Sequence, residues 1–304
     1  MAVYTENGAK AHKSTGNAVL DFFALGGAID NLPDKEQIKL LNKAYNEDAQ
    51  LTARAMFYFR DVRGGQGKRN VFRKQLTYLA GVRPAFLANL VHLIPEYGRW
   101  DDLYALVGTE LEPLAFDLIA KQIIVDLGSE RPSLCAKWLK SINASSTETK
   151  RLGRLTAKAL NLEERDYRKL LTQLRKRINL VETALTEGKT SEIIYSQVPS
   201  QAMNKYSKAF YRNDLDRFEN YINSVKSGEV KINAGTLYPQ QLVHNAMNGV
   251  NNVTDVLWEN LPDYTEGREE NSIAVVDVSG SMWGTPIEVA ISLGIFLAER
   301  ATGV

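Results

Sequence analysis

The chain has 304 residues, a formal net charge of +1 at pH 7, 44% hydrophobic and 24% charged residues. These values are typical of a globular protein, and no apolar run approaches the roughly 18 residues that a membrane span needs. The N-terminal stretch lacks an apolar signal region, and the one cysteine, Cys135, excludes an internal disulfide framework. His12, His92 and His244 are too far apart for a short-spaced zinc motif. We therefore expect a cytoplasmic protein without membrane spans or structural zinc.

Most of the chain has the spacing of amphipathic helices. Apolar residues recur at helical intervals in residues 33–63, 112–127, 131–142 and 164–185. Short loops rich in glycine or polar residues separate these segments. Helices of this length, repeated over about 250 residues, predict an α-solenoid or a ring of helical pairs. No fixed repeat period is visible.

The near-neutral total charge hides an uneven distribution. Residues 150–177 contain ten basic side chains against three acids, whereas residues 251–270 contain six acids and Arg268 alone. The chain therefore has a basic middle followed by an acidic joint.

A glycine-rich stretch, "RDVRGGQGKRNVFRK", places six basic residues around three glycines from Arg60 to Lys74. It is not a phosphate-binding P-loop, because Val62 stands where the first glycine belongs and Arg69 replaces the serine or threonine. Two interpretations stay open: a turn that exposes its basic side chains to a phosphate chain, or a solvated connection between helices.

The segment "ERDYRKLLTQLRKRINLVETAL" has the clearest helical pattern. Its apolar stripe contains Tyr167, Leu170, Leu171, Leu174 and Ile178, and basic residues such as Arg165, Lys169 and Lys176 occupy the opposite face. This basic face is either an ordinary solvated surface or part of a nucleic-acid site.

The last 33 residues have a different character. "SIAVVDV" predicts a strand buried on both faces of a parallel sheet, and Pro286 marks the start of a helix. Between them, Asp277, Ser279 and Ser281 form D-x-S-x-S, whose oxygens suit Mg²⁺. The alternative is a strand-end turn. The spacing fits neither a haloacid-dehalogenase-type phosphatase nor a G-x-S-x-G nucleophile elbow, so we expect ligands rather than nucleophiles.

The loop "VVDVSGSM" resembles the metal-ion-dependent adhesion site (MIDAS) of von Willebrand factor A domains. With "TENGAKAHKSTGNAVLDFF", "FRDVRGGQGKRNVFR", "IPEYGRWDDL", "YRKLLTQLRKRINLVE", "VPSQAMNKYSKAFYRND" and "VKINAGTLYP", it occurs in an order that resembles the DUF2828 family. That family looks related to the Ro autoantigen and its bacterial orthologue, the TROVE-domain proteins.

The resemblance implies a mainly α fold: a ring or arc of HEAT-like helical repeats, followed by the first strand, loop and helix of an α/β von Willebrand factor A domain. We expect a helical domain over residues 1–250, an acidic linker over 251–271 and a fragment of the A domain over 272–304. The metal site would be incomplete here, since the family's later loops supply further ligands.

The resemblance also implies RNA binding in a basic cavity that takes single-stranded ends of structured or misfolded non-coding RNA. Charge and position select the candidate contacts, which are Arg60, Arg63, Lys68, Arg69, Arg175, Lys176, Arg177, Lys205, Lys208 and Arg212.

Our first hypothesis is a non-catalytic RNA-binding protein, because no catalytic constellation stands out. The second is a protein-interaction scaffold whose metal loop captures an acidic residue of a partner. The third is a structural component of a larger, virion-like assembly, with oligomers formed through the C-terminal strand.

Overall fold

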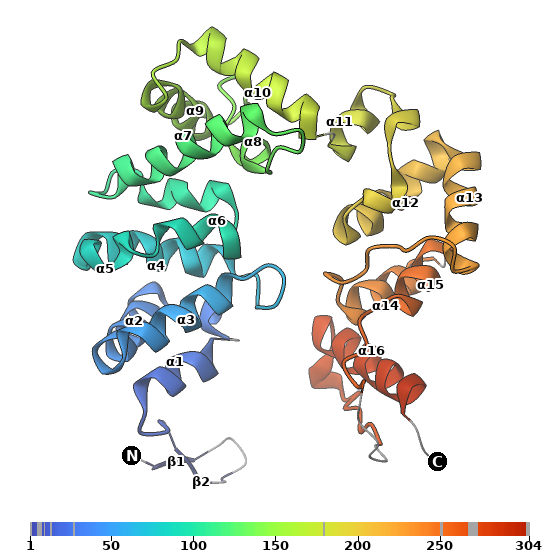
Figure 1. Ribbon diagram of the computed structural model, residues 1–304. Helices are drawn as coiled ribbons and strands as arrows, with labels where there is room; N and C mark the ends of the chain where they lie inside the picture. The colour runs from blue at the N-terminus through green and yellow to red at the C-terminus, as the bar shows by residue number, and fades with distance from the viewer. Residues whose placement is uncertain are drawn as a thin grey trace. The chain divides into compact units, whose positions relative to one another are not determined.

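The computed structural model describes residues 2–4, 8, 10–12, 14–26, 28–178, 180–249, 252–266 and 273–301. Their secondary structure is almost wholly helical (Figure 1), which confirms the predicted fold class at that level. The strands of the described residues are β1 (Ala2–Tyr4) and β2 (Lys10–His12), which pair in antiparallel register. Contacts divide the chain into two compact units, Met1–Ile178 (unit 1) and Asn179–Val304 (unit 2).

Unit 1 follows its hairpin with a succession of short and medium helices. They are α1 (Ala18–Leu25), η1 (Ile29–Asn31), α2 (Asp34–Glu47), α3 (Ala49–Arg60), α4 (Arg69–Val82), α5 (Pro84–Ala88), η2 (Val91–Leu93), α6 (Ile94–Tyr97), η3 (Trp100–Leu106), α7 (Glu112–Gly128), α8 (Cys135–Trp138), α9 (Thr147–Ala159) and α10 (Glu164–Ile178).

Local capping explains where the long helical patterns break. The pattern over residues 33–63 becomes two helices, because the carboxylate of Asp48 accepts the N–H of Leu51 at 2.8 Å and starts α3. Asn17 and Ser146 cap α1 and α9 in the same way. The predicted helix over 131–142 shortens to the single turn of α8.

The core of unit 1 is built from aromatic and aliphatic side chains of successive helices. The rings of Phe22 and Phe59 lie 5.1 Å apart, and those of Phe57 and Phe72 lie 5.2 Å apart. The apolar stripe of α10 packs into the same core, as its pattern predicts. Each fully buried side chain of this size stabilises the fold by about 1.5–3 kcal/mol.

Unit 2 contains the remaining helices. They are α11 (Val181–Thr186), η4 (Thr190–Glu192), η5 (Tyr195–Gln197), α12 (Ser200–Asn213), α13 (Leu215–Lys226), α14 (Pro239–Met247), α15 (Asn252–Glu259), η6 (Gly280–Met282) and α16 (Thr285–Arg300). Their core centres on the rings of Tyr195, Phe210 and Phe218, whose centroids lie 4.9–5.2 Å apart.

The predicted linker contains a buried helix. Val253, Val256 and Leu257 of α15 belong to the core of unit 2, although residues 267–272 lie outside the described part. Trp258 of α15 packs against Phe296 of α16, with ring centroids 6.2 Å apart. Contacts therefore put α15 and α16 in one unit and place the boundary between units at residues 178 and 179, inside the predicted domain 1–250. The domain boundaries near 250 and 271 stay predictions.

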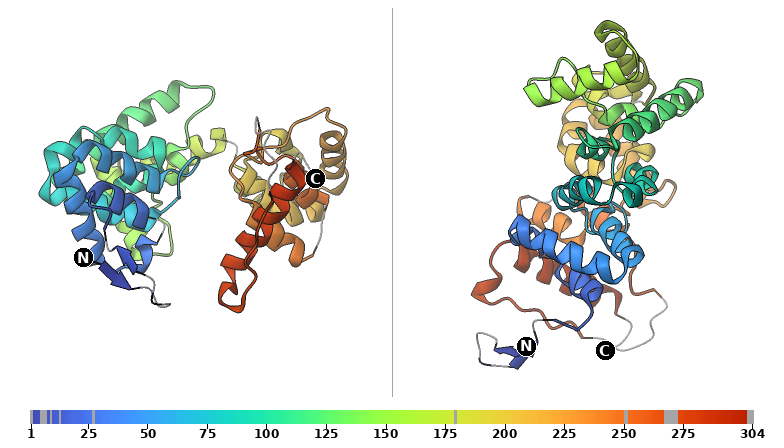
Figure 2. Two further views of the ribbon diagram at one scale, coloured as in Figure 1. Left: turned by 90° about the horizontal axis from the view of Figure 1, so that it is seen from below. Right: turned by 90° about the vertical axis from the view of Figure 1, so that its left-hand side faces the viewer.

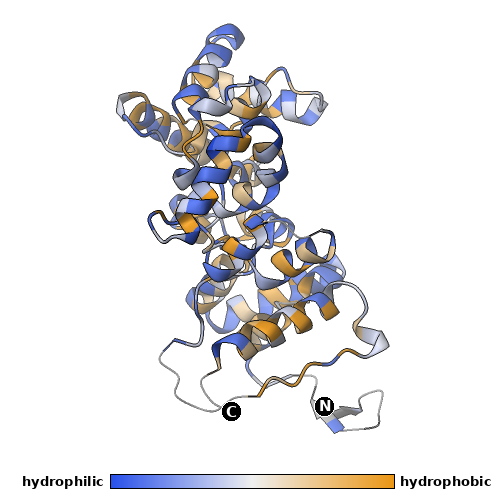
Figure 3. Cartoon of the chain, turned by 90° about the vertical axis from the view of Figure 1, so that its right-hand side faces the viewer, coloured by the Kyte–Doolittle hydropathy of each residue, from blue (hydrophilic) through white to orange (hydrophobic). Residues whose placement is uncertain are grey.

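The structure does not support the predicted buried strand over residues 272–278. Residues 273–279 form no regular secondary structure (Figure 3). Ile273 and Val275 are 90% and 91% exposed. Val276 packs closely against α16, since a Cβ at Gly294 of that helix would lie 2.5 Å from its Cγ2. A strand needs hydrogen bonds from a neighbouring strand, and the described residues offer none here. The helix predicted after Pro286 is present as α16.

Within the described residues, no helix is both long enough and apolar enough to span a bilayer.

Candidate nucleic-acid interface

Arg60, a predicted RNA contact, is a structural residue of the core of unit 1. It is 1% exposed, and its Nε donates to Oδ2 of Asp102 at 2.7 Å. The backbone of Gly98 also lies close to this carboxylate, because a Cβ at that position would be 2.5 Å from Asp102 Oδ2. In this arrangement Arg60 cannot reach a phosphate, so the assignment to RNA is corrected.

Three further charges extend this pair into a buried charge network (Arg60, Arg73, Asp101, Asp102 and Lys140). Arg73 Nε donates to Asp102 Oδ1 at 2.7 Å, and its Nη2 lies 2.9 Å from Asp101 Oδ2. Lys140 Nζ donates to Asp101 Oδ2 at 3.1 Å. Burial alone would raise the pKa of Asp101, but Arg73 and Lys140 offset it and lower that pKa below its usual 3.8.

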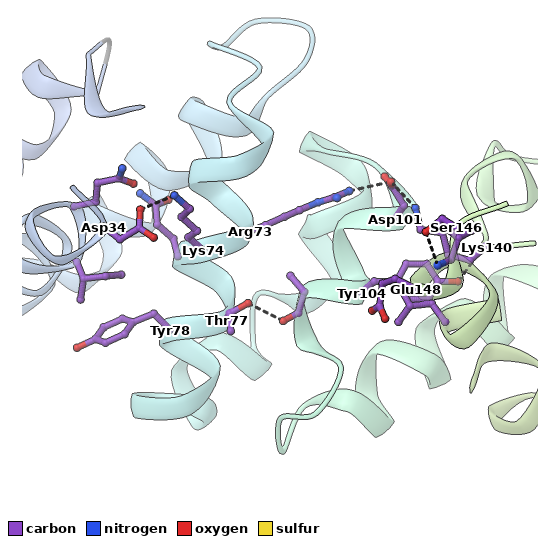
Figure 4. A pocket seen from close by; sticks show the side chains of 16 residues that line it. Asp34, Arg73, Lys74, Thr77, Tyr78, Asp101, Tyr104, Lys140, Ser146 and Glu148 are labelled. Atoms are coloured by element: carbon purple, nitrogen blue, oxygen red, sulfur yellow. Dashed lines mark hydrogen bonds and ion pairs between the residues drawn. The ribbon is translucent and has the colours of Figure 1, made fainter. Parts of the chain in front are cut away.

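Arg73, Asp101 and Lys140 of this network line a groove of about 720 Å³ beside α4 (Figure 4). In the figure, Arg73 reaches from α4 across to Asp101, with Lys140 behind it. Lys74, also in the groove, pairs with Asp34 at 2.6 Å. Because each of these cations already has a carboxylate partner, an anionic ligand would have to displace an existing ion pair.

Arg175 and Arg177, at the end of α10, point into unit 1 and bind backbone carbonyls. Arg175 donates from Nε to Ala136 O at 2.8 Å and from Nη2 to Leu139 O at 2.8 Å. Burial lowers the pKa of its guanidinium. Arg177 donates to Leu127 O at 3.1 Å and to Ser129 O, at the C-terminal end of α7. In this structure both guanidinium groups therefore cap helix ends, and their role as RNA contacts stays a prediction.

The glycine-rich loop closes the end of α3. The N–H groups of Gln66 and Lys68 donate to the carbonyls of Tyr58 and Phe59 at 3.1 and 2.7 Å. Gly65 is required there, because a Cβ would lie 2.0 Å from Tyr58 O. The structure thus favours the connecting-turn interpretation of the loop.

The basic side chains of this loop are only partly available. Arg63 is exposed but donates from Nη1 to Glu96 O at 2.8 Å, and Lys68 pairs with Asp30. Arg69, at the first residue of α4, lines a polar groove of about 760 Å³ with Asn70.

By contrast, α10 presents an exposed row of cations, the basic face, defined by Arg165, Arg168, Lys169 and Lys176. Their spacing puts them on one side of the helix, opposite the buried stripe. Within the described residues, only Lys169 has an acid nearby, Asp166 at 3.8 Å. Leu174 lies nine residues after Arg165, which is two and a half helical turns, so it is on the opposite side of α10. Leu174 is buried there. Helical spacing in the sequence contains this signal, but the contacts predicted from charge and position include Lys176 and omit Arg165, Arg168 and Lys169.

A second exposed row lies on α12 in unit 2 and was predicted from the sequence. Lys205, Lys208 and Arg212 are exposed and three and four residues apart, so they share one face of the helix. The ammonium of Lys205 lies 4.9 Å from the ring centre of Tyr206. No acid lies within 4 Å of the three cations in the described part of unit 2.

The predicted metal ligands lie together in the turn before α16. Asp277 Oδ1 accepts the N–H of Ser279 at 2.9 Å, and the hydroxyl oxygens of Ser279 and Ser281 are 3.1 Å apart. Adjacent ligands of an octahedral Mg²⁺ are separated by about 3.0 Å, given Mg–O bonds of 2.0–2.1 Å. The hydrogen bonds from Ser279 lower the pKa of Asp277. The two hydroxyl oxygens thus have a separation compatible with neighbouring Mg²⁺ ligands. Among the described residues, no group of three or more His, Cys, Asp or Glu side chains could hold a metal ion, so Asp277 would be the one carboxylate at this turn.

Comparison with known proteins places this architecture in a family. The family model described as "Domain of unknown function (DUF2828)" matches residues 5–114 and 133–285. The chain belongs to the DUF2828 family. An "Uncharacterized protein L728" of Acanthamoeba polyphaga mimivirus is 29% identical over 345 residues, covering 99% of this chain and 60% of that relative. The chain therefore spans about three-fifths of the relative's length. No solved structure matches it.

The DUF2828 match includes the basic face of α10, the cationic row of α12 and the turn that contains Asp277. It leaves out residues 115–132, which form most of α7 and the start of the following loop.

Proposed function

We propose that this DUF2828 protein is a non-catalytic RNA-binding protein whose principal contact is the basic face of α10. The single observation that supports this is the exposed row of Arg165, Arg168 and Lys176, which has no acid within 4 Å among the described residues. The cationic row of α12 supplies a second contact.

The physical argument rests on counterions. A cation without a carboxylate partner can bind a phosphate by releasing a solution ion, whereas a paired cation must first lose its partner. From Arg165 to Lys176 the helix advances about 16 Å, at 1.5 Å per residue. Such a row follows a phosphate backbone and reads no base. Selection would then depend on RNA shape and single-stranded ends, as the TROVE resemblance implies.

The test is a salt series of binding to a structured RNA with a single-stranded 3′ tail, with duplex DNA for comparison. We expect Arg165→Ala/Arg168→Ala/Lys176→Ala to flatten the salt slope by about 2, since each phosphate contact on a single strand contributes about 0.7. At 0.1 M salt that corresponds to about a hundredfold weaker binding.

The matched control removes the same charge from another exposed face of unit 1. Lys35, Lys39 and Lys43 are exposed and four residues apart on α2, and the triple alanine variant should keep nearly full affinity. Equal losses in both variants would mean that binding follows net charge alone. Binding by the unmodified chain that does not fall steeply with salt would refute the proposal.

A second candidate function, a scaffold that binds a partner through Mg²⁺, is favoured by the 3.1 Å separation of Ser279 Oγ and Ser281 Oγ. Trp283 is 82% exposed and two residues away, so its fluorescence can report on metal binding. A Mg²⁺ titration should change this fluorescence, and the change should be absent in Asp277→Ala. Trp283→Phe gives the background signal of the other tryptophans. A response unaffected by Asp277→Ala would eliminate the candidate.

A further inference from the structure

The helix α7 exposes apolar side chains that its own unit does not cover. Ile124 is 70% exposed and Val125 62%, and Leu114 and Leu127 are also exposed. The opposite side of the helix, with Phe116, Ile119 and Ile123, is buried in the core of unit 1. Such a concentration of exposed apolar side chains on one element marks an interaction surface.

The exposed half of α7 is firmly held by polar contacts. The carboxylate of Asp126 accepts hydrogen bonds from Gln122, from the N–H of Ser133 and from the hydroxyl of Ser133, each at 2.8 Å. Arg177 of α10 binds the last carbonyls of the helix. Figure 2 shows this part of α7 reaching beyond the neighbouring helices of unit 1. The apolar side chains are thus presented on an anchored helix.

Most of this surface lies in a stretch that the family model does not match. Residues 115–132, which include Asp117, Lys121, Ile124 and Val125, fall between the two stretches that match the DUF2828 model. Apart from Leu114, the surface is therefore outside the stretches that the family model matches, and it does not depend on the proposed RNA binding.

The pattern on the exposed face of α7 is self-complementary. Leu114, Asp117, Lys121 and Ile124 follow one another at spacings of three, four and three, which places them in one row. Their order along the helix is apolar, acidic, basic, apolar. In a two-fold antiparallel arrangement centred on position 119, Leu114 faces Ile124 of the second copy and Asp117 faces its Lys121. Each pair occurs twice, as an isologous contact requires.

We propose that the exposed face of α7 is a homodimer contact, in which two copies of this chain pair antiparallel through this row. In the single chain, Asp117 and Lys121 form an ion pair within α7 at 2.7 Å. In the dimer, Asp117 of each copy would pair instead with Lys121 of the other copy. Stable interfaces bury about 1,200–2,000 Å². A contact made by one helix per copy lies at or below that size, so we expect a reversible dimer with a Kd on the order of micromolar.

The test is sedimentation velocity of the full chain, without RNA, over a concentration series. Ile124→Ser/Val125→Ser should weaken the dimer at least about tenfold, because two apolar side chains lose their burial. Both positions are exposed in the single chain, so circular dichroism and the thermal midpoint should not change.

A charge swap tests the antiparallel register itself. Asp117→Lys alone should dissociate the dimer, since like charges then face each other, and Asp117→Lys/Lys121→Asp should restore it. A monomer at all concentrations would overturn the proposal. A dimer whose affinity does not change in Ile124→Ser/Val125→Ser would also overturn it. The same holds for a dimer that is lost only in Val275→Ser, which alters the exposed segment before α16.

Discussion

The buried charge network and the basic face of α10 use the same residue types for opposite purposes. In the network, Arg60 and Asp102 are almost fully removed from solvent and bind each other at 2.7 Å. On α10, Arg165 and Arg168 are exposed, and no acid of the described residues lies within 4 Å of their guanidinium groups. The first region holds helices together, and the second leaves its charge available to a ligand.

The difference lies in what the neighbouring element offers each arginine. Asp101 and Asp102, at the start of η3, face α3 and α4, and the carboxylates there supply the partners that buried guanidinium groups require. On the outer side of α10, the described residues place no acid within 4 Å of Arg165 or Arg168. A basic residue of this chain therefore indicates a ligand contact only when its structural surroundings are known. Four predictions test the difference between the paired cations of the network and the exposed cations of α10.

The largest effect is expected from Asp102→Asn. It leaves Arg60 buried beside a neutral group, and breaking such a pair costs about 3–5 kcal/mol of unfolding free energy. Urea unfolding should show a lower midpoint, while Glu163→Gln, at an exposed acid, should not. An unchanged midpoint for Asp102→Asn would show that the network does not stabilise unit 1.

Arg175→Ala should have the next largest effect. It leaves the carbonyls of Ala136 and Leu139 without their donors, and hydrogen bonds from a charged group contribute about 1.5–3 kcal/mol. Thermal unfolding should detect the loss, and Arg175→Lys should restore it only in part because lysine lacks the forked geometry. RNA affinity, measured below the unfolding range, should stay unchanged. Weaker RNA binding with unchanged stability would instead return Arg175 to the candidate contacts.

Acid should weaken the network before it affects the exposed face. The pKa of Asp101 is lower in the folded chain than in the unfolded chain. Its contribution is therefore fully present above pH ~4 and is lost as the pH falls through the folded value. Unfolding midpoints measured from pH 6 down to 2.5 should fall less steeply in Asp101→Asn, which starts from a lower stability. Parallel curves for the two proteins would contradict this assignment.

The smallest effect is expected from Lys176→Ala, one residue before the inward-facing Arg177. Lys176 is exposed, so its removal should leave the unfolding midpoint unchanged and lower only RNA affinity. Arg177→Ala should give the reverse result, with faster hydrogen exchange at the end of α7. Similar behaviour of the two variants would remove the distinction between inward and outward cations on α10.

The predictable part of the fold is the part that depends on neighbours in the chain. The spacing of Tyr167, Leu171 and Leu174 predicts the buried side of α10, and the structure confirms it. The apolar run at 273–278 misleads, because β-branched residues favour a strand only where another strand pairs with them. Whether such a pairing strand is present depends on residues far away in the chain, which the local composition does not specify.

The candidate site likewise has residues that helical spacing can place and residues whose partners lie far away in the chain. Helical spacing is enough to place Lys205, Lys208 and Arg212 on one exposed face, as the structure has them. It cannot show that Arg60 meets a carboxylate 42 residues away or that Arg175 meets carbonyls 36 and 39 residues away. Charge alone therefore does not show which cations are buried or already paired.

By itself, the sequence determined the helical class, the buried stripes, the D-x-S-x-S turn and the resemblance to the DUF2828 family. Only the tertiary structure decided which cations remain available, that α15 and α16 share one core, and that Ile124 and Val125 of α7 stay uncovered. The physical reason is that periodicity follows from bonds between nearby residues. The burial of a charge or an apolar side chain depends on which distant element packs against it.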